Sequence, residues 1–193
     1  MRALLKTQPS ACYVVTLPEP DDFDFWREQA RALAQAGVSP DRVSWVEPGG
    51  DGGLFGQGEP VPEPPPDAAP VRANKRLIGL AKNAILHSDR ERFALLYRLL
   101  WRLQSNPHLM EDKADPEVRR LEELDKSVRR DSHKMHAFVR FRLVEDGPEN
   151  ENDGDHYVAW FEPEHHILRA NAGFFVRRFA NMKWSILTPA GSL

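Results

Sequence analysis

VRFRL, at residues 139–143, alternates apolar and basic side chains, and YVAWF, at residues 157–161, is an apolar run of similar length. A period of two is typical of a β-strand that has one buried face. The segment between them, EDGPENENDGD at residues 145–155, holds six acidic residues and no basic one. These features predict a β-hairpin with a long polar tip.

Three segments before the hairpin have the periodicity of helices. The first begins after Asn74 and carries an apolar stripe. The second, RFALLYRLLWRL at residues 92–103 after a capping Asp89, is apolar almost all round, so it must be central. The third opens at Asp115 and Pro116, a cap followed by a proline. A further helix around residues 174–179 and a last strand, KWSIL at residues 183–187, follow the hairpin.

The N-terminal part reads as strand, helix and strand. ACYVVTL at residues 11–17 and VSWV at residues 43–46 are the strands; Asp21 or Asp22 caps the helix and Gly37 follows its end. We therefore expect an α+β fold: a small sheet with a β-hairpin packed by several helices, plus this short N-terminal unit. The expected division is an α/β unit at 1–47, a Gly/Pro-rich linker at 48–70 and a helical plus hairpin body at 71–193. Whether the unit and the body share one core stays open.

The composition excludes several classes of protein for this chain. The single cysteine, Cys12, excludes a disulfide framework, a cysteine zinc site and an iron–sulfur cluster within this chain. Neither a signal peptide nor a membrane-spanning run is visible, so we expect a cytoplasmic protein with no membrane partner. Residues 1–70 carry a net charge of −6 and residues 71–193 a net charge of +3. A basic body suits a polyanionic partner, although solvated helix faces have the same composition.

Four blocks of sequence carry a resemblance to one family. They are RFALLYRLLWRL (92–103), VRRDSHKMHAFVRFR (128–142), YVAWFEPEHHIL (157–168) and FFVRRFANMKWSILTP (174–189). In this order they resemble a probable DNA-metabolism protein of bacteria. That protein stands N-terminal to UdgX-type uracil-DNA glycosylases, or is encoded beside a radical-SAM putative DNA-repair protein.

The resemblance implies an accessory module of a DNA-repair system, which binds DNA or positions a partner enzyme. The implied partners are DNA, a UdgX-type glycosylase module and a radical-SAM repair protein. Members of the family continue beyond the SILTP block, so we expect this chain to be truncated at its C-terminus. The glycosylase module is absent, and uracil excision is therefore not expected of these residues.

Basic residues around the hairpin are the candidates for nucleic-acid contact. Guanidinium and ammonium groups spaced along a surface bind phosphates. If Arg140 and Arg142 share a sheet face with His156 or Trp160, bases could stack beside the phosphate contacts. The alternative is that these cations pair with nearby acidic residues as surface salt bridges. The candidates are Arg129, Arg130, Lys134, Arg140, Arg142, Trp160, Arg177, Arg178 and Lys183.

Histidines give a second hypothesis. His133 and His136 lie one helical turn apart, and the hairpin brings Glu162 and His165 back towards them. These four residues are candidates for a divalent metal site (Zn²⁺, Mn²⁺ or Fe²⁺), and His133, Glu162 and His165 for acid–base catalysis. Buried histidines bonded to the backbone are the structural alternative.

Three functions follow from these patterns. The first is a DNA-associated accessory module without catalytic activity of its own. The second is a metal- or histidine-dependent enzyme that processes nucleic acid. The third is a protein-docking adaptor for the radical-SAM partner.

Overall fold

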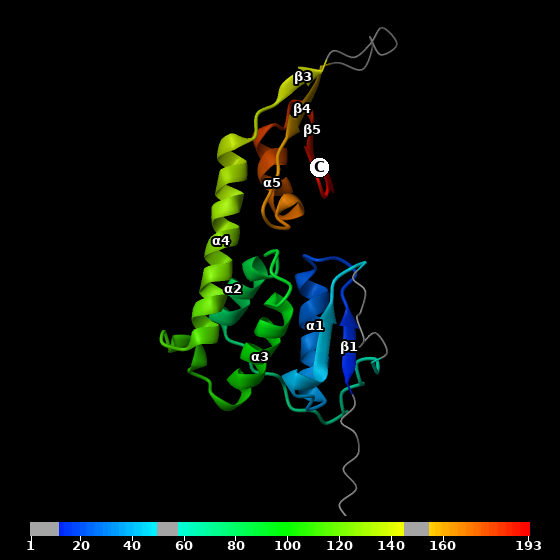
Figure 1. Cartoon of the computed structure of the whole chain (residues 1–193), viewed down its shortest axis with the longest axis vertical. Coiled ribbons are helices and arrows are strands. Elements are labelled where there is room, and N and C mark those ends of the chain that lie inside the picture. The colour runs from blue at the N-terminus through cyan, green and yellow to red at the C-terminus, as the bar shows by residue number, and fades with distance from the viewer. Residues whose placement is uncertain (1–11, 50–57, 145–154) are drawn as a thin grey trace, which may run out of the picture.

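The computed structural model describes residues 12–49, 58–144 and 155–193 (Figure 1). In these ranges it confirms the α+β class. The helices are α1 (Phe23–Gln35), α2 (Lys75–Ala84), α3 (Arg92–Ser105), α4 (Pro116–Phe138) and α5 (Leu168–Arg178). The strands are β1 (Tyr13–Thr16), β2 (Val43–Val46), β3 (Arg142–Val144), β4 (His156–Trp160), β5 (Lys183–Thr188) and β6 (Gly191–Ser192).

The N-terminal unit folds as its sequence predicts. β1 and β2 pair in parallel, and α1 forms the crossover between them. Asp22 caps α1 by accepting a hydrogen bond from the amide of Phe25 at 2.9 Å. Gly37 follows the helix with a φ of 70°, a conformation that a side chain would strain. The predicted linker also contributes a contact, because the amide of Val14 donates to the carbonyl of Glu59 at 3.2 Å.

The helices α2, α3 and α4 pack together around an apolar centre. α3 is the central one, as predicted, and eight of its residues are buried. Asp115 caps α4 by accepting from the amides of Glu117 and Val118. One hydrophobic cluster contains the buried apolar residues of β1, α1, α3 and β5.

A buried arginine joins the N-terminal unit to the helices. The side chain of Arg92 is fully buried, and its guanidinium forms a salt bridge with Glu47 at 2.7 Å. It also donates to the carbonyls of Ile85 at 2.7 Å, Pro20 at 2.8 Å and Asp89 at 2.9 Å. Four acceptors from three parts of the chain therefore meet at one planar group.

The second sheet has the order β3-β4-β5-β6. β3 and β4 form the predicted antiparallel hairpin, whose acidic tip at residues 145–154 lies outside the described residues. β5 runs parallel to β4 after the α5 crossover, and the short β6 strand was not predicted.

The prediction that Arg140 lies on a strand is wrong. α4 continues to Phe138, and β3 begins only at Arg142. The guanidinium of Arg140 donates to the carbonyls of Ala137 at 2.7 Å and Val139 at 3.0 Å. The last carbonyls of a helix have no partner within the helix, so a cation there stabilises its end.

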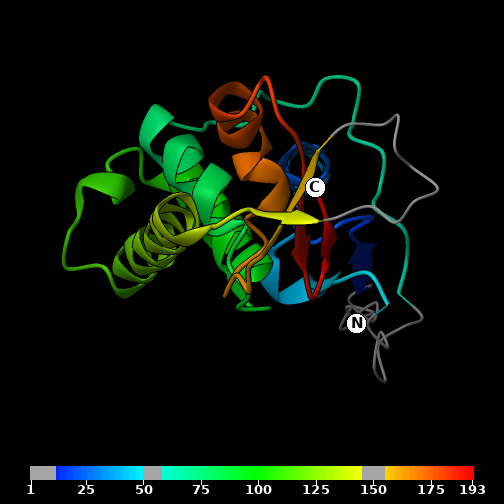
Figure 2. The ribbon, with the colours of Figure 1, turned by 90° about the horizontal axis from the view of Figure 1, so that it is seen from above.

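α4 connects the two halves of the molecule. Its first turns pack against α2 and α3, and its last turns reach the second sheet (Figure 1). Seen from above, α5 lies between α4 and this sheet, on one side of the strands (Figure 2). In the described ranges no helix combines the length and apolar character that crossing a bilayer requires.

Candidate nucleic-acid interface

The strand register divides the second sheet into two faces. Arg142 pairs with Val158, and Val158 pairs in turn with Ser185, so these three side chains lie on the same face. The alternation of side chains assigns every second residue of β3, β4 and β5 to that face. We call it the open face; it comprises Arg142, Val144, His156, Val158, Trp160, Lys183, Ser185 and Leu187.

The other face is the buried one. Ala159 and Ile186 are 2% and 0% exposed. The ring of Trp184 packs against that of Phe175 on α5, with the ring centroids 6.2 Å apart. On the open face, by contrast, Trp160 is 58% exposed and Leu187 is 40% exposed. α5 therefore covers one side of the sheet and leaves the open face to solvent.

An aromatic ring on the open face is available for stacking. The indole nitrogen of Trp160 donates to a carboxylate oxygen of Glu162 at 2.9 Å, and this bond holds the ring by its edge. On the same face, a ring nitrogen of His156 lies 3.1 Å from the hydroxyl of Ser185. A ring held by its edge can present a π face to a planar ligand such as a base.

The structure brings three of the predicted nucleic-acid residues onto this one face. Arg142 and Lys183 are exposed, and they lie on β3 and β5, the two strands that pair directly with β4, which carries Trp160. The expected combination of a cation with His156 and Trp160 on one face therefore holds for Arg142. It does not hold for Arg140, which caps α4 instead.

The candidates on α4 lie on another surface. Arg129 pairs with Asp125 at 2.8 Å, and Lys134 pairs with Glu164 at 2.6 Å. Arg130 is exposed and forms no ion pair within the part of the chain that the structure describes. For Arg129 and Lys134 the salt-bridge alternative is thus the observed arrangement.

Arg177 and Arg178 lie at the C-terminal end of α5, on the helix that covers the buried face of the sheet. Both are exposed, but they stand behind the open face. Residues 126–144 and 168–183 hold ten lysines and arginines and one acidic residue, the buried Asp131, whereas Asp155, Glu162 and Glu164 flank β4.

The histidine candidates are not brought together. His133 is exposed on α4. His136 stacks on the ring of Phe174 with centroids 3.8 Å apart. Glu162 accepts from the indole of Trp160. Across residues 12–49, 58–144 and 155–193, no group of three His, Cys, Asp or Glu side chains is placed to hold a metal ion.

His165 lies in a separate buried cluster. Its Nε2 is 2.9 Å from the hydroxyl of Ser127, and its Nδ1 is 3.1 Å from the hydroxyl of Ser88. Its backbone amide donates to Asp131 at 3.0 Å. Burial lowers the pKa of His165 and raises the pKa of the Asp131 carboxyl. His165 is thus a buried histidine bonded to the backbone, which was the structural alternative to a metal or catalytic site. Its ring contacts Ser127 on the inward side of α4.

Some residues of each site could not be predicted from the sequence. His87, whose ring contacts that of His165, has no motif around it, and only the fold places the two rings 4.1 Å apart. Ser185 and Leu187 join the open face because β5 pairs in parallel with β4. The alternation within KWSIL could have indicated which residues share a face, but not which strand they neighbour.

A family model described as a domain of unknown function, DUF4130, matches residues 90–192. This match covers α3, α4 and the whole second sheet with α5, and so includes every residue of the open face. Neither the curated proteins nor the solved structures contain a match to this chain. Because the match spans more than half of the chain, the protein belongs to the DUF4130 family.

Proposed function

We propose that the chain is a DNA-associated accessory module that binds single-stranded DNA on the open face of its second sheet. The observation that carries the proposal is the exposed ring of Trp160 on one sheet face with Arg142 and Lys183. Stacking on an aromatic ring and phosphate contact by flanking cations are the two interactions with which sheet surfaces bind single strands.

A single strand fits this face better than a duplex does. In a duplex the bases are stacked on one another and paired, so their π faces are not available to a tryptophan. A single strand exposes them, and each stacked base contributes roughly 1–3 kcal/mol. The open face is also short, since its three longer strands have three, five and six residues.

The biological role we propose is that of a helper of DNA repair. The blocks at residues 128–142, 157–168 and 174–189 resemble a module that accompanies UdgX-type glycosylases and a radical-SAM repair protein. A module that holds the single strand would keep the substrate of such a partner close to it. No catalytic step is assigned to this chain.

Fluorescence anisotropy tests the proposal. The probe is a labelled oligothymidylate of about 15 nucleotides, alone and as a duplex with its complement, titrated with the protein. We expect the single strand to bind more tightly than the duplex. We expect Trp160→Ala to weaken binding about tenfold, in line with the loss of one stacked base, and Trp160→Phe to restore most of it.

Val176→Ala is the matched control, because Val176 is 56% exposed but lies on α5, away from the open face. It should leave the affinity unchanged. Absence of binding at low salt, or equal losses of affinity in Trp160→Ala and Val176→Ala, would contradict the proposed function.

A second candidate, docking of a partner protein on the same face, is favoured by one observation. Val144, Trp160 and Leu187 are exposed apolar side chains on one surface, at 43%, 58% and 40%. Such surfaces commonly mark protein interfaces. Association with the radical-SAM partner that persists at high salt and after nuclease treatment, without any binding of the oligonucleotide, would favour docking.

A further inference from the structure

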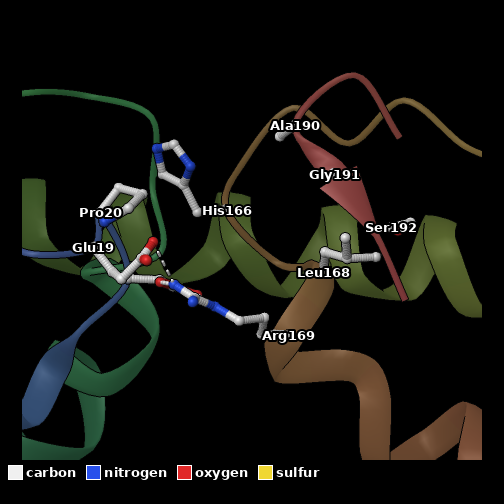
Figure 3. A pocket seen from close by; sticks show the side chains of 9 residues that line it. Glu19, Pro20, His166, Leu168, Arg169, Ala190, Gly191 and Ser192 are labelled. Carbon is white, nitrogen blue, oxygen red and sulfur yellow. Dashed lines mark hydrogen bonds and ion pairs between the residues drawn. The ribbon is translucent and has the colours of Figure 1, made fainter. Parts of the chain in front are cut away.

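A cavity of about 210 Å³ lies where the N-terminal unit meets the second sheet (Figure 3). Its walls come from three parts of the chain that are distant in sequence. These are the turn before α1, the start of α5, and β6 with the turn before it. The lining residues are Glu19, Pro20, Asp21, His166, Leu168, Arg169, Ala190, Gly191 and Ser192.

His166 lines this cavity with its imidazole ring. Its backbone amide is bonded to the carbonyl of Leu86 at 2.8 Å, which fixes the residue in place. Its imidazole lines the cavity (Figure 3), and its ring forms no hydrogen bond or ion pair with any residue in the described ranges. Burial, aided by the nearby charge of Arg92, lowers the pKa of His166, so the ring is neutral at neutral pH. A neutral imidazole offers one donor and one acceptor.

The charged residues of the cavity are already paired with one another. Arg169 donates to Asp21 at 3.0 Å and to Glu19 at 3.1 Å. Because two carboxylates face one guanidinium, the cavity carries an excess of negative charge, and a phosphate would be repelled. The carboxylate oxygens can still accept from an N–H group of a neutral ligand, and Leu168, Pro20 and Ala190 supply apolar contact.

This combination of a neutral imidazole, carboxylate acceptors and apolar walls suits a planar, neutral heterocycle. The cavity also adjoins the open face. Leu187, a residue of that face, pairs with Trp160 on one side and with Ser192 of the cavity wall on the other. Two strand spacings separate Trp160 from Ser192, about 10 Å, which is about three nucleotides at the rise of stacked DNA.

We propose that this cavity binds one unstacked nucleobase of a DNA strand whose neighbouring bases lie on the open face. His166 and the carboxylates of Glu19 and Asp21 contact the polar edge of the base. The sugar and phosphate stay outside, towards Ser192. That the base belongs to a DNA strand rests on the proposed function of the open face. The preference of the cavity for a planar heterocycle does not rest on it.

Binding of free nucleosides tests the cavity by itself. Isotope-labelled protein is titrated by NMR with the four deoxynucleosides and deoxyuridine, and in parallel with inorganic phosphate. We expect millimolar nucleoside to shift the amide signals of His166, Arg169 and Ser192, and phosphate to leave them in place. His166→Ala should weaken nucleoside binding up to about tenfold, as expected for the loss of one hydrogen bond to the base.

A variant that fills the cavity gives a second readout. Ala190→Trp places a bulky ring in the cavity from an exposed turn, and Ala180→Trp, at an exposed position after α5, is the matched control. An oligonucleotide that carries one 2-aminopurine becomes brighter when that base leaves the stack. We expect this brightening with the unaltered protein and with Ala180→Trp, and its loss in Ala190→Trp.

The outcomes separate the two proposals. Nucleoside shifts that vanish in Ala190→Trp, in a protein that binds no oligonucleotide, would support the cavity and contradict the function of the open face. Oligonucleotide binding without nucleoside shifts, or with 2-aminopurine brightening that survives Ala190→Trp, would overturn the cavity proposal and leave the open face standing. Equal shifts from phosphate and nucleosides would also overturn it.

Discussion

His87 and His165 lie against each other with their ring centroids 4.1 Å apart and their planes tilted by 31°, and both accept a backbone hydrogen bond at Nδ1. The amide of Asp89 donates to His87 at 2.9 Å, and the amide of Ser88 donates to His165 at 3.3 Å. An Nδ1 atom that accepts cannot also carry a proton, so both rings are neutral in this arrangement. The pair joins the turn before α3 to the segment that precedes α5.

We predict that stability falls between pH 7 and pH 5 because of this pair. Burial, with a smaller effect of His165, lowers the pKa of His87 to about 4, and burial lowers that of His165. The unfolded chain therefore binds more protons than the folded chain below about pH 6.5, and the free energy of unfolding decreases as pH falls. The expected loss is roughly 1 kcal/mol, since partial exposure of His87 screens part of the effect.

Urea unfolding at the two pH values measures this loss. Glutamine at position 87 can still accept from the amide of Asp89 but does not titrate, so His87→Gln should flatten the pH dependence. His108→Gln is the control, because His108 is 80% exposed and should leave the profile as it is. A profile that is equally steep in His87→Gln and the unaltered protein would contradict the prediction.

Replacement of Arg92 should destabilise the whole chain. Arg92→Met leaves the carboxylate of Glu47 and three carbonyls without their donor, and loss of one partner of a buried ion pair costs about 3–5 kcal/mol. Arg90→Met should cost less than about 0.5 kcal/mol, since Arg90 is 85% exposed and lies 3.5 Å from Glu47. Denaturant unfolding of the two variants makes the comparison, and similar midpoints would contradict the assigned role.

The steepness with which salt weakens DNA binding should be determined by the cations of the open face. Each phosphate contact to a single strand contributes about 0.7 to the slope of log K against log salt. The double variant Arg142→Gln, Lys183→Gln should therefore reduce that slope by about 1.4. The double variant Arg129→Gln, Arg130→Gln on α4 should not change it. If the α4 variant had the larger effect, the strand would lie along α4 instead.

Local patterns sufficed to predict most of the elements. The caps at Asp22, Asn74 and Asp115 mark helix starts because their side chains accept from nearby amides, which is a property of a few consecutive residues. The hairpin was visible because alternation and a polar tip are also local. The start of β3 was placed too early because Arg140 continues the alternation of residues 139–143 but is used to cap α4.

The sites were less predictable, since they depend on contacts between distant segments. Trp160 and Arg142 were identified by residue type, but their common face follows from the register of β3 against β4. His165 was identified as a candidate with His133, yet the two lie on opposite sides of α4, because Ser127 and Asp131 face inward. The cavity around His166 combines residues 19–21, 166–169 and 190–192, and no local pattern relates these three segments.

The most direct test of the open face is an NMR map of the protein with and without the oligothymidylate. We expect that the indole N–H of Trp160 and the amides of β3, β4 and β5 shift most, and that α4 and the buried face shift little. Shifts concentrated on α4, or the absence of any shift at Trp160 under conditions where the strand binds, would contradict binding of the strand on the open face.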